Sequence, residues 1–163
     1  MHGRCNVVIG NKYEDFESNS EVSKILDRIV SEYSRGSNLG RNACCNIPLN
    51  GVIFAKSYRE FIDALESCKV VFVLITTTHC PYCKLFKPIF YRTAEQYSSK
   101  AAFIEVNADF VPEAALMFNV YSTPTTVVLI DGKVADGLIG YIPANYFKEY
   151  IDNLLDDIKC IQS

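Results

Sequence analysis

Two cysteines separated by two residues form the part of this 163-residue chain best suited to chemistry. They lie in the tetrad Cys80-Pro81-Tyr82-Cys83, which follows an apolar run and opens a helical pattern. Cysteines at this spacing can close a small disulfide ring. At a helix N-terminus the unpaired N–H groups and the helix dipole favour an anion, so Cys80 is predicted to be the nucleophilic thiolate. Cys83, nearly one turn further along, is predicted to be more buried. It is expected to resolve the mixed disulfide that Cys80 forms with a substrate.

The segments around the tetrad predict a regular α/β unit. The run 70–76 is apolar and β-branched throughout, which is typical of a buried central strand. Asp131-Gly132 lies between two apolar runs and predicts a β-hairpin turn. Strands are expected at 52–55, 70–76, 102–106, 125–130 and 133–140, and helices at 57–68, 80–97, 112–118 and 143–158. This order predicts a mixed sheet with helices on both faces.

Residues 1–50 have a different character and predict an N-terminal extension, followed by one domain at 51–163. One amphipathic helix is expected at about residues 20–34, because six apolar side chains recur there at helical spacing. These are Val22, Ile25, Leu26, Ile29, Val30 and Tyr33. The loop after this helix carries the neighbouring cysteines Cys44 and Cys45.

Composition excludes several classes of function. Sixteen basic against nineteen acidic residues give a net charge of −3, so no basic face for nucleic acid is expected. The longest apolar run, Val70 to Ile75, is far shorter than the ~20 residues that span a bilayer. With no secretory signal visible, a soluble cytoplasmic protein without a membrane partner is expected. Seven cysteines are an odd number, so at least one is a free thiol or pairs with another molecule.

From about residue 51 to 160 the chain resembles the thioredoxin superfamily. The matching marks are Cys83-Lys84 followed by Pro88, the segment 103–109 with its Asn and Asp, Thr123-Pro124-Thr125, Gly132 and Gly140. A CxxC tetrad alone is a moderately specific signal, but together with the helix proline and a Pro-Thr loop it is strong. The resemblance implies a thioredoxin-like α/β fold, with a central mixed β-sheet flanked by helices after the N-terminal helical extension.

The resemblance also implies roles for single residues. Pro124 is expected to be cis, to leave its neighbour's backbone free to pair with an extended substrate peptide, and to block metal capture by the thiols. Thr123 is expected to tune the sulfur environment, while Pro81 and Tyr82 shape the contact surface. The implied activity is thiol–disulfide exchange on protein substrates, in a monomer that receives electrons from a thioredoxin-reductase-type partner and needs no organic cofactor. Phe86, Phe90 and Tyr91 are expected in the core.

The chain departs from the thioredoxin pattern in four respects. His79 stands where the family has Trp, and the Cys-Pro-Tyr-Cys tetrad is the one found in glutaredoxins. Leu74 occupies the position of the family's buried aspartate, and Glu105 that of its buried lysine. We therefore expect Glu105 to take over the proton role and accept the Cys83 proton through water, with a pKa raised by burial.

Several alternatives stay open at this point. A glutathione-dependent glutaredoxin, a disulfide oxidase or isomerase, and a non-catalytic binding module could each use this scaffold. The absence of a Gly-Gly pair at Asp131-Gly132 favours protein substrates over glutathione. A zinc site would need four ligands, and only His79 lies near the tetrad. Cys44 and Cys45 could pair with Cys5, Cys68 or Cys160, a bond between the two neighbours being the least favourable choice.

Overall fold

The computed structural model describes residues 24–29, 44–45 and 50–158. The chain divides into two compact units, 1–40 and 41–163. In the first unit residues 24–29 are helical, which confirms the centre of the expected helix, while its remaining turns lie outside the described residues. No helix in the described ranges is long and apolar enough to cross a bilayer.

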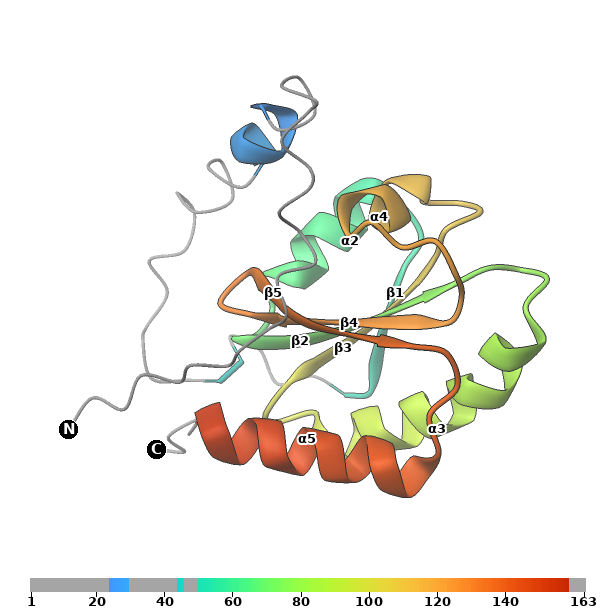
Figure 1. The fold of residues 1–163 in the computed structure, drawn as a ribbon. Coiled ribbons are helices and arrows are strands. Elements are labelled where there is room, and N and C mark those ends of the chain that lie inside the picture. The colour runs from blue at the N-terminus through green and yellow to red at the C-terminus, as the bar shows by residue number, and fades with distance from the viewer. Residues whose placement is uncertain (1–23, 30–43, 46–49, 159–163) are drawn as a thin grey trace. The chain divides into compact units, whose positions relative to one another are not determined.

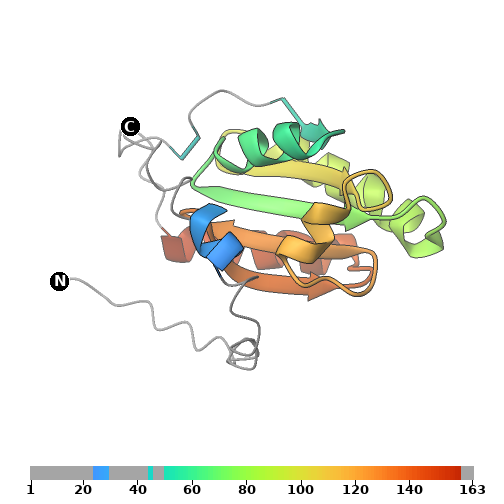
Figure 2. The same ribbon diagram turned by 90° about the horizontal axis from the view of Figure 1, so that it is seen from above.

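Five strands form one sheet in the second unit, in the order β1-β3-β2-β4-β5. Their bounds are β1 Val52–Ala55, β2 Val70–Thr76, β3 Ala102–Asn107, β4 Thr125–Ile130 and β5 Lys133–Ile139. The order can be followed in Figure 2, where the sheet is seen from above. Strand β3 runs parallel to both β1 and β2, whereas β4 is antiparallel to β2 and to β5. The expected mixed sheet is thereby confirmed.

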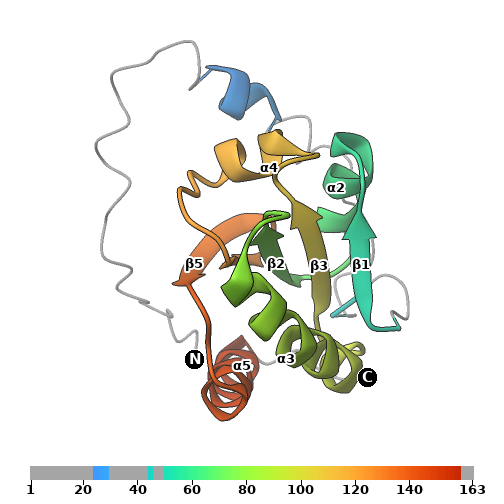
Figure 3. The same cartoon turned by 90° about the vertical axis from the view of Figure 1, so that its right-hand side faces the viewer.

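Four helices cover the two faces of this sheet. They are α2 Tyr58–Leu65, α3 Pro81–Tyr97, α4 Pro112–Met117 and α5 Ala144–Ile158. Helices α2 and α4 lie on one face, and α3 and α5 lie on the other (Figures 1 and 3). Ser57 caps α2, since its side chain accepts a hydrogen bond from the Glu60 N–H, as expected for a serine at this position.

Strand β2 is the buried centre of the fold. All seven of its residues are buried, which agrees with its uninterrupted apolar sequence. Leu74 illustrates the arrangement, because it lies beside Glu105 of β3 on one side and Thr126 of β4 on the other. The segment that leads to the two tetrad cysteines therefore begins at the end of the most deeply buried strand of the sheet.

An aromatic cluster holds α3 and α5 against the sheet. The ring of Phe90 on α3 lies 5.4 Å from that of Phe103 on β3, and the Phe86 ring lies 5.2 Å from that of Phe147 on α5. All four side chains are fully buried. Buried aromatic pairs of this kind contribute large apolar areas and favour edge-to-face geometry. This packing fixes the helix that begins at the tetrad.

The hairpin between β4 and β5 turns at Asp131-Gly132, as the sequence predicts. Both residues have positive φ angles, of 52° and 76°. Two-residue hairpin turns with positive φ at both positions match the right-handed twist of the flanking strands. Asp131 also donates its N–H to the Lys69 carbonyl at the start of β2, so the turn is tied to the sheet.

A disulfide bond joins Cys45 to Cys68, just before β2 begins. The two residues also form an isolated antiparallel bridge, and the Lys69 N–H donates to the Cys44 carbonyl oxygen at 2.7 Å. Among the pairings left open by the sequence, this one is now shown for Cys45, and it excludes a bond between Cys44 and Cys45. Cys44 also takes part in a disulfide. The pairings of Cys5 and Cys160 fall outside the described residues.

Removing the Cys45–Cys68 link is expected to lower the free energy of unfolding by about 3 kcal/mol, the effect of a disulfide between residues 23 apart. The variant is Cys45→Ser combined with Cys68→Ala, since Cys68 is buried and Cys45 is half-buried. Urea unfolding of this variant and of the unaltered chain, both without reductant, measures the difference. In excess dithiothreitol the two curves should coincide. Equal free energies of unfolding for the variant and the unaltered chain without reductant would show that the Cys45–Cys68 disulfide does not stabilise the fold.

Candidate active site

Several chain segments meet at one end of the sheet. The C-terminal ends of β2 and β3, the start of β4 and the end of β5 all lie there, because β4 is antiparallel to β2 and to β5. Cys80 follows β2, Asp109 follows β3, Pro124 precedes β4 and Gly140 follows β5. Residues distant in the sequence are thus brought to a common edge.

The two tetrad cysteines occupy the first turn of α3 and are joined by a disulfide, with their Cα atoms 5.2 Å apart. Cys80 is the N-cap residue, and its Sγ accepts a hydrogen bond from the Cys83 N–H at 3.1 Å. Cys80 is 6% exposed and Cys83 only 1%, which confirms that the second cysteine is the more buried. The Cys80 sulfur therefore lies where backbone N–H groups and the helix dipole stabilise negative charge.

Two prolines shape α3. Pro81 takes the first helical position, where a missing N–H costs no intrahelical hydrogen bond. Pro88 lies inside the helix, so the carbonyl one turn before it loses its usual partner, which favours a bend at this point. Pro88 thus separates the turns that carry both cysteines from the rest of α3.

The loop before β4 faces the cysteine loop. The Thr123–Pro124 peptide bond is cis, as the resemblance implied. The Thr123 hydroxyl lies 2.9 Å from that of Thr77, which follows β2, and the Pro124 carbonyl accepts the Gly140 N–H at 2.8 Å. Pro124 is buried, whereas Thr123 is half-buried. These contacts hold the loop in place, so the structure brings Thr123 and Pro124 to the edge that carries Cys80.

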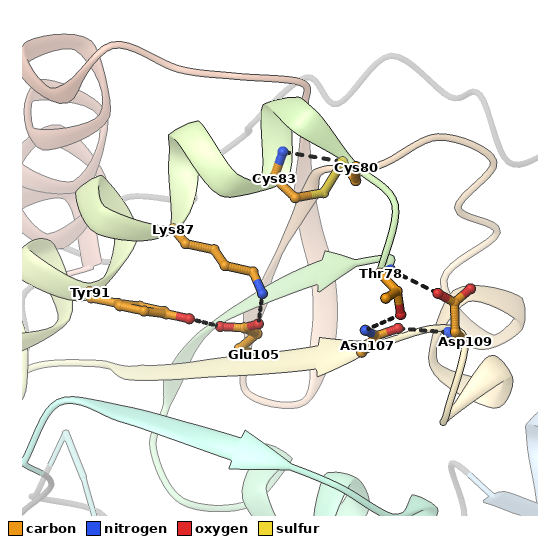
Figure 4. Close-up of polar contacts among 8 residues, drawn as sticks. All are labelled: Thr78, Cys80, Cys83, Lys87, Tyr91, Glu105, Asn107 and Asp109. Carbon is orange, nitrogen blue, oxygen red and sulfur yellow. Dashed lines mark hydrogen bonds and ion pairs between the residues drawn. A yellow bond between two sulfur atoms is a disulfide. The ribbon is translucent and has the colours of Figure 1, made fainter.

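A polar clamp supports the other side of the cysteine loop (Figure 4). Asp109 accepts the Thr78 N–H at 2.7 Å, Asn107 donates to the Thr78 hydroxyl, and the Asp109 N–H donates to the Asn107 side chain. The hydrogen bonds from Thr78 to its carboxylate lower the pKa of Asp109. The carboxylate therefore stays ionised at neutral pH and fixes Thr78, two residues before Cys80.

The surface beside the disulfide is partly aromatic and exposed. Tyr82 is 63% exposed and Pro81 is also exposed, while their place on a substrate-contact surface stays a prediction. His79 is exposed next to Cys80, as a loop residue in the position of the family's Trp would be.

Glu105 lies on β3 beneath α3 and is 7% exposed, so its expected burial is confirmed. Its Oε1 forms an ion pair with the Lys87 ammonium at 2.6 Å, and its Oε2 accepts a hydrogen bond from the Tyr91 hydroxyl. Both partners belong to α3, as Figure 4 shows. The carboxylate thus faces the active-site helix with both of its oxygens engaged.

Tyr91 was expected in the apolar core, but its side chain makes both an apolar and a polar contact. Its ring packs edge-on against Phe54 of β1 at 5.7 Å, and its hydroxyl reaches Glu105. Burial, together with the hydrogen bond to this carboxylate, raises the pKa of Tyr91. The phenol therefore remains protonated over the physiological range and acts as a hydrogen-bond donor to Glu105.

The family model described as Thioredoxin matches residues 52–153. The chain belongs to the thioredoxin family. It is 28% identical over 157 residues to a protein named Thioredoxin X, chloroplastic, of Arabidopsis thaliana, covering 94% of this chain and 86% of that protein. A thioredoxin of Chlorobaculum thiosulfatiphilum is 31% identical over 103 residues, covering 63% of this chain and 95% of that protein. Thioredoxins are thiol–disulfide oxidoreductases, and this chain belongs to that enzyme class.

Solved structures agree on the fold. The thioredoxin of Malassezia sympodialis superposes with a TM-score of 0.58 at 24% identity, covering 66% of this chain and 93% of that one. A thioredoxin variant from Halobacterium salinarum superposes equally well, with a TM-score of 0.58. The thioredoxin-like fold predicted from the sequence is confirmed.

Four residues of this thioredoxin's site were not foreseen as site residues: Thr77, Thr78, Lys87 and Tyr91. A sequence signal did exist for Lys87, since it follows Cys83 by four residues and must lie on the same face of α3. In the described part of the chain no group of three His, Cys, Asp or Glu side chains could hold a metal ion.

Proposed function

We propose that this thioredoxin reduces disulfide bonds in protein substrates. The Cys80 thiolate attacks one sulfur of a substrate disulfide, the substrate S–S bond breaks, and one substrate thiolate leaves. Cys83, once deprotonated, attacks the Cys80 Sγ, the mixed disulfide breaks, and the second substrate thiolate leaves. The enzyme ends with the Cys80–Cys83 bond, having passed two electrons to the substrate.

One observation carries this proposal: the Cys80 sulfur is the N-cap of α3 and accepts the Cys83 N–H. A sulfur in this position is stabilised as an anion by the adjacent N–H groups, and a thiolate is the reactive form of cysteine. A buried disulfide whose only role is stability needs neither the N-cap position nor the facing loop.

The loop at Thr123 supports a polypeptide as the substrate. Strand β4 begins only at Thr125, and the Thr123 backbone pairs with no residue in the described ranges. An extended segment can hydrogen-bond to such a backbone in the manner of an added strand. The exposed ring of Tyr82 beside the disulfide offers apolar contact to the substrate's side chains.

The remaining parts of the proposal concern partners. A dithiol reductase of the thioredoxin-reductase type returns two electrons to the Cys80–Cys83 disulfide. The two sulfur atoms carry these electrons themselves, so no organic cofactor takes part. We expect a monomer, without nucleic-acid or membrane partners. The cytoplasmic location stays a prediction, since some relatives are named as chloroplast proteins.

Insulin reduction tests the proposed function directly. The full chain, with dithiothreitol as electron donor, should reduce insulin much faster than dithiothreitol alone. In a parallel assay, a glutathionylated peptide with glutathione as the only donor should turn over slowly. Insulin reduction at the background rate would overturn the proposal, and rapid turnover with glutathione would identify a glutaredoxin-type activity.

Glu105 is the proposed acceptor of the Cys83 proton. It is buried under the helix that carries Cys83, and the neighbouring position on β2, Leu74, offers no ionisable group. Two buried hydroxyls, of Thr76 and Thr126, have no hydrogen-bond partner in the described ranges. By strand alternation they lie on the same face as Leu74, so polar groups line this face near the proposed path.

Replacing Glu105 by Gln is expected to slow the attack of Cys83 at least about tenfold, as for loss of a general base. The fold should persist, because Gln has the same shape and can still accept the Tyr91 hydrogen bond. The rate is read as the decay of a preformed mixed disulfide on Cys80. Glu95→Gln, at an exposed position on α3, is the control. A rate unchanged by Glu105→Gln would remove Glu105 from the mechanism.

A further inference from the structure

Lys87 has an unusual setting for a lysine. Its side chain is only 30% exposed, and it descends from α3 to the buried carboxylate of Glu105. A buried charge is tolerated when it is paired and hydrogen-bonded, and Glu105 meets both conditions through Lys87 and Tyr91. The neighbouring Lys84, by contrast, is exposed. A lysine held in this way brings a positive charge beneath the active-site helix.

The position of Lys87 relative to Cys83 follows from helix geometry. Residues four apart on a helix have Cβ atoms about 5–6 Å from each other and share one face. Figure 4 shows the Lys87 side chain leaving α3 on the side of Cys83 and ending at Glu105. Lys87 therefore begins on the helix face that carries Cys83, and its ammonium ends at the Glu105 carboxylate.

We infer that Lys87 is a positioning residue for the resolving step, keeping negative charge compensated while a proton moves from Cys83 to Glu105. This inference rests on the proposed function. Before the transfer, the ammonium balances the Glu105 carboxylate beside a neutral Cys83 thiol. After it, the ammonium balances the Cys83 thiolate beside a neutral Glu105 acid. The number of protons and the net charge of the three groups are the same in both states.

Electrostatics favours this arrangement. A thiolate formed at a 1%-exposed position without a nearby cation would lose its hydration and gain little in return. A cation already in place stabilises it without further reorganisation. Tyr91 does not compete for the proton, because it remains a neutral donor to the carboxylate. Its hydrogen bond holds the carboxylate while the ammonium turns toward the sulfur.

Other titratable groups near this cluster are few. On the sheet, the register neighbours of Glu105 are Phe54 of β1 and Leu74 of β2, and neither titrates. The first turns of α3 carry Cys80, the exposed Tyr82 and the exposed Lys84. Near them, His79 in the preceding loop is exposed, and Tyr141, which packs edge-on against Phe86, is 44% exposed. Lys87 is therefore the cation most closely tied to the Cys83–Glu105 path.

A chromogenic aryl disulfide separates the two chemical steps. Attack by the Cys80 thiolate releases one coloured thiol, and attack by Cys83 on the resulting mixed disulfide releases a second. Reaction of the reduced full chain, followed by rapid mixing across a range of pH, gives a rate for each step. The Cys83→Ser variant shows the first step alone and corrects for any other reactive thiol.

For Lys87→Met the second step is expected to slow about tenfold at neutral pH, with its midpoint moved up by about one pH unit. The first step should keep its rate and its midpoint. Lys87→Arg, which retains the charge, should restore most of the rate. Lys84→Met, at an exposed position on the same helix, should change neither step. A second step in Lys87→Met that matches the unaltered chain at every pH would overturn the inference.

A further comparison guards against loss of the fold, because Lys87→Met leaves Glu105 buried without its ion pair. Lys87→Met combined with Glu105→Gln removes both charges. The inference predicts a slower second step in this double variant than in Glu105→Gln alone, and equal rates would overturn it. Insulin reduction by the unaltered chain is the separate test of the proposed function. If it fails while the second step still depends on Lys87, only the assigned substrate is wrong.

Discussion

Replacing Cys80 by Ser is expected to lower the rate of insulin reduction by at least about a thousandfold. A serine hydroxyl at this N-cap still accepts the Cys83 N–H, so α3 should begin at the same residue. What disappears is the thiolate that attacks the substrate disulfide, because a hydroxyl stays protonated where a thiol ionises. The loss should appear in turnover without a change in helical content.

The chain offers a matched control for this experiment. Cys45→Ser with Cys68→Ala also removes a disulfide, but at the opposite end of β2 from the tetrad. This variant should reduce insulin at close to the unaltered rate at a temperature where it is folded. Full activity in Cys80→Ser, or an equal loss in both variants, would contradict the assignment of Cys80 as the nucleophile.

Replacing Cys83 by Ser is expected to convert the enzyme into a trap. Cys80 can still attack, but the mixed disulfide with the substrate then persists, since no thiol is left at the buried position to break it. Mass spectrometry of the protein after incubation with an oxidised peptide should show one peptide bound per chain. The bound peptide should be released by dithiothreitol.

Turnover in this variant should fall nearly to zero when no small thiol is present. The control is the double variant Cys80→Ser with Cys83→Ser, which should bind no peptide covalently. Absence of the adduct in Cys83→Ser, or its presence in the double variant, would show that the order of the two cysteines is wrong or that another thiol reacts. The 6% and 1% exposures of the two residues lead us to expect neither result.

Much of this fold could be predicted because its signals are local. The apolar run of β2 and the Asp131-Gly132 turn each depend on a few adjacent residues, and each appears where the sequence indicated. The expected helix 57–68 ends earlier, with α2 finishing at Leu65. Helix ends are set by the packing of the last turn and are less well marked in the sequence.

The parts that escaped prediction are contacts between distant elements. The pairing of Cys45 with Cys68 depends on where the chain before β1 lies, which no periodicity encodes. The partners of Glu105 depend on the rotation of α3 over the sheet, which the aromatic cluster decides. Exchange of the family's buried aspartate and lysine for Leu74 and Glu105 was visible in the sequence. The lysine that balances Glu105 became evident only when α3 was placed over β3.

The strand at the centre of the sheet has a sulfur–sulfur bond near each end, Cys45–Cys68 before it and Cys80–Cys83 after it. An experimenter who loads the active site with a chemical reductant therefore offers electrons to a second acceptor in the same molecule. Exhaustive titration of the protein counts these two disulfides and the one formed by Cys44 together. The stoichiometry of the catalytic couple has to be read from brief, substoichiometric treatment. Under these conditions we expect the Cys80–Cys83 bond to be reduced first, because the helix N-terminus stabilises the Cys80 thiolate that is released.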